Sequence, residues 1–97
     1  MQPSDLKAMF ANVPSSEYRQ FERVPGKLSH RRDLHAFMLL DSLVPGTGSI
    51  VEAATDDDLY LNVDICQLAT SGITKAQVVE LVRCGVNFSE KCLSMSI

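Results

Sequence analysis

The sequence has no tryptophan and only three cysteines, Cys66, Cys84 and Cys92, among its 97 residues. Three is an odd number, and no two of the cysteines form a CxxC pair. This usage excludes a disulfide framework or a four-cysteine metal site, so we expect reduced, buried thiols.

No apolar run approaches the roughly 18 residues of a membrane-spanning helix. The N-terminus, with Pro3 to Asp5, lacks the basic and apolar regions of a signal peptide. We therefore expect a cytoplasmic protein with no membrane contact.

The residue spacings that mark catalysis are also missing. His30 and His35 stand apart from the cysteines, and no nucleophile is spaced to meet a base. The glycine-rich segment 45–49 has no GxxxxGK[ST] pattern, so we interpret it as a loop. We predict a non-enzymatic protein with no catalytic residue, no cofactor and no metal site. Because folding can bring distant side chains together, an enzyme stays open as a minor alternative.

Charge is distributed unevenly along the chain. Residues 1–32 contain six basic and three acidic side chains, a net charge of +3. Residues 33–97 contain three basic and nine acidic side chains, a net charge of −6. This contrast predicts a basic, partly irregular N-terminal arm over 1–32 and a single α+β domain over 33–97.

The N-terminal arm contains one helical pattern. Residues 1–12 predict a short helix that Ser4 caps. Residues 13–32 include two prolines and a Pro-Gly pair, which are typical of irregular structure. Within them we expect partial order at Tyr18 and Phe21.

Two longer helices are predicted in the domain. Residues 33–44 follow a possible cap at Asp33 or Ser29, and their apolar stripe includes Leu34. Residues 74–84 form the second helix.

The second helix carries the stronger end signals. Thr74 and Gln77 have the spacing of a capping box. Gly85 supplies a left-handed stop, with Arg83 in the last turn.

Strands are predicted at residues 59–63, 86–88 and 92–97, the last two joined by a hairpin loop at 89–91. The final strand alternates and has the character of a sheet edge. Residues 50–54 fit either a strand or a helical turn. The predicted fold is therefore α+β, with a small antiparallel three-stranded sheet that two main helices cover.

A short helix at 65–71 before the helix at 74–84 resembles a helix-turn-helix. The outer face of the second helix offers few cations, chiefly Lys75 and Arg83, and its surroundings are acidic. The basic run at 27–32 is short. Nucleic-acid binding, as an accessory or regulatory protein, is thus a second alternative, which the shortage of cations disfavours.

Three short strings carry a resemblance to known proteins: LVPGT at 43–47, LNVD at 61–64 and RCGV at 83–86. In this order, residues 34–97 resemble small proteins that phages and prophages encode, for which no activity is assigned. The resemblance implies a small accessory protein of a mobile element, one that interferes with a host system.

The main functional hypothesis is stoichiometric binding of a host protein, with inhibition or sequestration as the result. The acidic residues Asp56, Asp57 and Asp58 are the predicted partner-binding side chains. Carboxylates on one surface can imitate a phosphate pattern and attract a cationic protein.

The alternative is an oligomeric binder of a small anionic signalling nucleotide, with a homo-oligomer forming pockets between subunits. Cations of the arm would bind phosphate, and aromatic rings would stack on the base. The predicted ligand-binding residues are Arg19, Arg23, Lys27, Arg31, Arg32, Tyr18 and Phe21.

Overall fold

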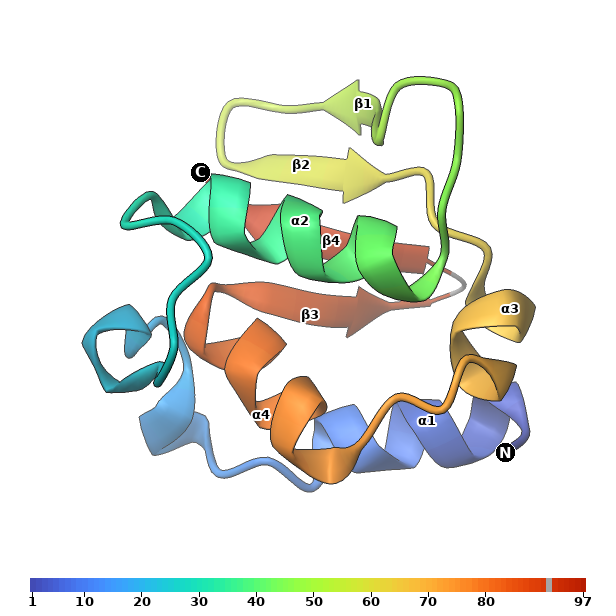
Figure 1. The fold of residues 1–97 in the computed structure, drawn as a ribbon, viewed down its shortest axis with the longest axis horizontal. Helices are drawn as coiled ribbons and strands as arrows, with labels where there is room; N and C mark the ends of the chain where they lie inside the picture. The colour runs from blue at the N-terminus through green and yellow to red at the C-terminus, as the bar shows by residue number, and fades with distance from the viewer. Residues whose placement is uncertain (91) are drawn as a thin grey trace.

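The structure is a computed structural model that describes residues 1–90 and 92–97. Helices pack with an antiparallel β-sheet, so the predicted α+β class is confirmed (Figure 1). In chain order the elements are α1 (Pro3–Ala11), η1 (Ser15–Glu17), η2 (Phe21–Arg23), α2 (Arg32–Leu43), β1 (Val51–Ala54), β2 (Asp58–Leu61), α3 (Ile65–Thr70), α4 (Lys75–Arg83), β3 (Val86–Ser89) and β4 (Cys92–Ser96).

The sheet of the described residues has four strands in the order β1-β2-β4-β3, and all neighbours are antiparallel. The prediction of three strands is wrong because residues 51–54 form β1, which pairs with β2 across a bulge. The prediction of the final strand as an edge is also wrong. β4 lies in the middle because it pairs with β2 on one side and with β3 on the other.

The register of the sheet aligns apolar side chains from three strands. Residues directly opposite in neighbouring strands point to the same face. The two aligned rows are Leu59, Met95 and Val86, and Leu61, Leu93 and Phe88. Four of these six side chains are buried in the core, and the other two, Leu59 and Phe88, are half-buried at its margin. The opposite face carries Tyr60, Ser94 and Asn87.

Helix α2 lies across one face of the sheet, with α4 beside β3 (Figure 1). The description of two main helices is imprecise, because α1 has the same nine-residue length as α4 and packs on α3, α4 and β3. Leu6 of α1 is 0% exposed, and the Phe10 ring lies 6.1 Å from the Phe88 ring. The first helix therefore forms part of the core.

Two predicted helix caps are wrong. The cap of α1 is Gln2, not Ser4, and the Gln2 N–H donates to the Asp5 carboxylate at 2.9 Å. The residue before α2 is Arg31, and no side chain caps this helix. The segment that leads into α2 is held in place by contacts of Arg23, Lys27 and Arg32 with other parts of the chain. A capping side chain is therefore not needed to position the helix.

The signals around α4 are confirmed. Thr74 and Gln77 form the reciprocal capping box. Gly85 has a φ of +93°, the left-handed conformation in which a side chain is strained.

The apolar stripe of α2 is as predicted except at Leu34. Leu34 is 44% exposed, whereas His35 and Ala36 are buried. The hairpin between β3 and β4 begins one residue later than predicted, since Ser89 pairs with Cys92; residue 91 of the predicted loop lies outside the described residues. Within the described part of the chain, no helix is both long and apolar enough to cross a membrane.

Candidate functional site

Residues 15–23 lie against α4, and ion pairs hold them there. Glu17 accepts from Arg83 at 2.6 Å and from Arg23 at 2.9 Å. Arg83 also donates to the Arg23 carbonyl at 3.1 Å. The hydrogen bond from Arg83 is the main reason why the pKa of Glu17 lies below its ordinary value of 4.5. Arg23 is thus part of an internal network.

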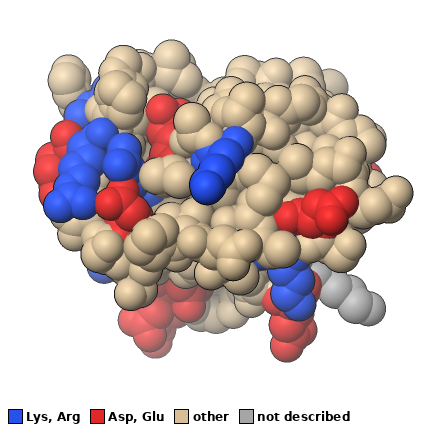
Figure 2. Space-filling view, turned by 90° about the horizontal axis from the view of Figure 1, so that it is seen from below, with Lys and Arg blue, Asp and Glu red and all other residues tan. Residues whose placement is uncertain are grey.

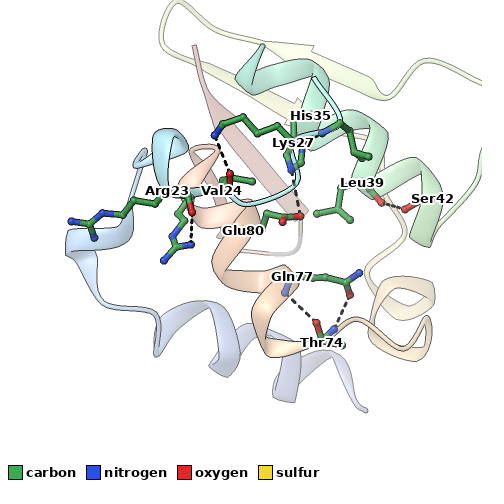
Figure 3. Close-up of polar contacts among 11 residues, drawn as sticks. Arg23, Val24, Lys27, His35, Leu39, Ser42, Thr74, Gln77 and Glu80 are labelled. Atoms are coloured by element: carbon green, nitrogen blue, oxygen red, sulfur yellow. Dashed lines mark hydrogen bonds and ion pairs between the residues drawn. The ribbon is translucent and has the colours of Figure 1, made fainter. Parts of the chain in front are cut away.

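Lys27 is also engaged inside the chain (Figure 3). Its Nζ donates to the Val24 carbonyl at 2.9 Å and, more weakly, to the Glu22 carbonyl at 3.4 Å. The same ammonium lies 5.3 Å from the centre of the Phe21 ring. The proposed stacking ring and the proposed cation therefore contact each other.

Arg32 connects the beginning of α2 to the C-terminal ends of α4 and β4. Its Nη1 donates to the Cys84 carbonyl at 2.7 Å and to the carbonyl and hydroxyl of Ser96 at 3.0 and 3.2 Å. A Cβ at Gly85 would collide with this guanidinium. Gly85 is therefore required for its conformation and for the space that Arg32 occupies.

The remaining predicted ligand-binding residues are not gathered into one pocket. Arg19 and Arg31 are exposed. Tyr18 lines a hollow with Phe10 and Val82, and none of the residues that line this hollow is a cation. Seen from below, one group of Lys and Arg side chains lies at the left of the surface with Asp and Glu side chains among them, and other Lys and Arg side chains lie near the centre and the lower edge (Figure 2).

His35 is buried, 1% exposed, between α2 and α4. Its Nδ1 accepts from the Leu28 N–H at 3.0 Å, which leaves the proton of the neutral ring on Nε2. Nε2 lies 3.3 Å from a Glu80 carboxylate oxygen, a contact without hydrogen-bond geometry (Figure 3). The Phe21 ring covers the imidazole at 5.7 Å. The His35 ring therefore contacts three residues from other parts of the fold: Leu28, Glu80 and Phe21.

The cysteines occupy three different environments. Cys84 is buried at the end of α4, and burial raises the pKa of its thiol from 9.0 to about 12. Cys66 is exposed and Cys92 is half-buried. Among residues 1–90 and 92–97, no group of three or more His, Cys, Asp or Glu side chains is placed to hold a metal ion.

Helices α3 and α4 are joined by the four residues 71–74, as in a helix-turn-helix. In a DNA-binding domain, the second helix presents a free face to the major groove. Here η1 and η2 cover part of α4, and its Glu80 and Arg83 face His35 and Glu17. Only Lys75 and Ala76 of α4 are exposed. The outer face of this helix is thus used for internal packing.

The acidic turn Thr55–Asp58 joins β1 to β2 and projects from the end of the sheet (Figure 1). The Thr55 hydroxyl accepts from the backbone N–H groups of Asp58 and Asp57 at 3.0 and 3.4 Å. The Thr55 N–H donates to the Asp58 carbonyl at 2.8 Å. Within the described residues, no hydrogen bond or ion pair uses the carboxylates of Asp56, Asp57 or Asp58. The backbone and Thr55 form the turn, and the carboxylates remain available.

Two further residues belong to the same end of the molecule. The Ile97 N–H donates to the Asp57 carbonyl at 2.9 Å, and Ile97 is 58% exposed. Asp33, in the first turn of α2, lines one hollow together with Ile97. We call this region the acidic end and define it as Asp33, Asp56, Asp57, Asp58 and Ile97.

No protein-family model matches the chain, and no curated protein sequence or solved structure matches it at a significant level.

Sequence reasoning missed Asp33, Ile97 and Glu17 as parts of these surfaces. Asp33 was assigned as a helix cap, and Ile97 as the end of an alternating strand. Glu17 was counted only as one acid in a basic segment, although it holds two arginines. Nothing in the local sequence distinguishes these roles, because each depends on a contact with a residue far away in the sequence: Ile97 with Asp57, Asp33 with Ile97, and Glu17 with Arg83, which is 66 positions away.

Proposed function

We propose that this protein is a non-enzymatic binding protein whose acidic end docks on a cationic surface of a partner protein. One observation carries this proposal. Three of the six cations of residues 1–32, Arg23, Lys27 and Arg32, donate to groups of the chain itself, whereas the carboxylates of Asp56, Asp57 and Asp58 have no such partner among the described residues. The acidic charge is therefore displayed rather than neutralised.

Displayed charge of one sign has a clear physical effect on association. Carboxylates in a rigid turn attract a cationic surface over a distance of about 10 Å at moderate salt. Such attraction mainly speeds association and disfavours partners with like charge. A turn held by backbone hydrogen bonds also loses little entropy when it binds.

The partner that we propose is a host protein, which follows from the resemblance to phage and prophage proteins and not from the geometry. Binding would be stoichiometric and would inhibit or sequester that protein. The nucleotide alternative would require Arg23, Lys27 and Arg32 to leave the contacts that they make in the fold. We therefore favour the acidic end.

Affinity capture from a host lysate tests this function. The variant Asp56→Asn/Asp57→Asn removes two charges from the acidic end. A matched variant, Glu22→Gln/Asp41→Asn, removes two exposed charges elsewhere. We expect the wild type and the matched variant to retain a protein at low salt that the first variant loses. If all three chains capture the same proteins, the acidic end is not the binding surface.

A further inference from the structure

An open hollow of about 340 Å³ lies at the acidic end, between the start of α2 and the end of the sheet, and Asp33 and Ile97 are part of its lining. Its walls are apolar on one side, where Leu59, Met95 and Ile97 meet. Asp33, Arg32 and Ser96 complete the lining. For comparison, an apolar cavity of about 150 Å³ holds a benzene-sized molecule. The hollow is therefore large enough for one bulky side chain.

The single cation in the lining does not make this hollow an anion site. Nη1 of Arg32 is directed to three oxygen atoms, on Cys84 and Ser96. Asp33 lies in the same lining, and the backbone of Asp58 pairs with that of Ser96. A carboxylate or phosphate would thus have to pass the Asp33 carboxylate to reach a guanidinium whose Nη1 is already engaged.

Apolar walls with an acidic border are complementary to one kind of occupant. Partner surfaces often bind through an apolar anchor in a pocket, surrounded by polar contacts that exclude water. Asp33 lies in the lining, and Asp57 and Asp58 are next to it through their backbone contacts with Ile97 and Ser96, so charge complementarity favours cations beside the anchor. Ile97, at 58% exposure, forms a wall that such an anchor would cover.

We infer that this hollow receives one bulky apolar side chain of a partner protein, from a segment in which Lys or Arg residues flank that side chain. This inference rests on the proposed function and adds to it the identity of the recognised segment. The carboxylates attract the segment, and the hollow selects it among cationic segments by its apolar residue.

Two blocked pentapeptides test the inference: Lys-Lys-Leu-Lys-Lys and its matched control Lys-Lys-Gly-Lys-Lys. Each is titrated into the full chain at low salt and followed by backbone amide resonances. We expect the leucine peptide to bind about tenfold more tightly, because burial of an isolated leucine side chain is typically worth at least that factor. The largest shifts should fall at Leu59 and Ile97.

Variants of exposed residues locate the effect without disturbing the core. Ile97→Ser should remove most of the preference for the leucine peptide, and Ile97→Leu should preserve it. Met38→Ser is the matched control, since Met38 is 42% exposed and lies outside the lining of the hollow. A similar loss in both serine variants would overturn the assignment.

The outcomes separate the inference from the proposed function. Equal binding of the two peptides, with loss in Asp56→Asn/Asp57→Asn, would overturn the role of the hollow and leave an acidic docking surface. Binding of neither peptide would overturn the hollow as a site for this segment, whereas the capture experiment decides the proposed function by itself.

Discussion

Three of the six basic side chains of residues 1–32 and the three acidic side chains at 56–58 are used by the fold in opposite ways. Arg23, Lys27 and Arg32 donate to carbonyls or carboxylates inside the chain. The carboxylates of the acidic turn have no partner among the described residues. A charge cluster in a sequence therefore predicts neither a binding site nor a structural contact until its neighbours are known.

Side-chain length and position explain this difference. Lys and Arg have long, flexible side chains that reach the unpaired carbonyls near helix and strand ends. Arg32 does so at Cys84, the residue that ends α4. An aspartate at the tip of a hairpin has a short side chain, and the rest of the protein lies on only one side of it.

The largest expected effect concerns the N-terminal region as part of the core. Leu6→Ala should lower the free energy of unfolding by about 3 kcal/mol, because Leu6 is 0% exposed and a cavity would remain. Urea denaturation measures the loss. Met1→Ala, at an exposed residue, is the control and should change stability by less than about 0.5 kcal/mol. Equal effects would mean that α1 does not depend on core packing.

Arg32→Ala should have the next largest effect. It removes a charged donor from the carbonyls of Cys84 and Ser96, and we expect a loss of about 2 kcal/mol. Arg31→Ala removes the same charge from an exposed neighbouring position and serves as the matched control. If the two variants are equally stable in urea, the cation of Arg32 is not structural and the contrast between the two clusters fails.

A smaller effect is expected at Glu17, and it should depend on pH. The pKa of Glu17 lies below its ordinary value of 4.5 in the folded chain, so its ion pairs stabilise the fold above that value. This stability is lost as pH falls through the folded pKa. Glu17→Gln should therefore be less stable than the wild type at neutral pH, with the difference shrinking in acid. Denaturation at neutral pH and near pH 3 compares the two chains; a constant difference would contradict the ion-pair network.

The smallest effect on stability is expected at the acidic turn. Asp56→Asn/Asp57→Asn should change the free energy of unfolding by less than about 0.5 kcal/mol, since no contact within the described residues uses these carboxylates. Thermal unfolding of the variant measures this. A clear loss of stability would show that the turn, like the basic cluster, serves the fold.

Local signals in the sequence were sufficient for part of the fold. The capping box of Thr74 and Gln77 and the left-handed Gly85 involve neighbours along the chain, so their chemistry can be read from spacing. Alternation likewise predicts β4, although not its central place. β1 was undecided because VEAA has a weak pattern, and its pairing with β2 determines its conformation.

The candidate site shows the same division. The sequence by itself determined the α+β class, the ends of α4 and the presence of an acidic turn, because these depend on residues a few positions apart. Only the tertiary structure decided that Arg32 meets Cys84 and Ser96, that Glu17 binds Arg83, and that Asp33 and Ile97 share a hollow. These contacts join residues 52 to 66 positions apart, and packing of the helices on the sheet brings them together.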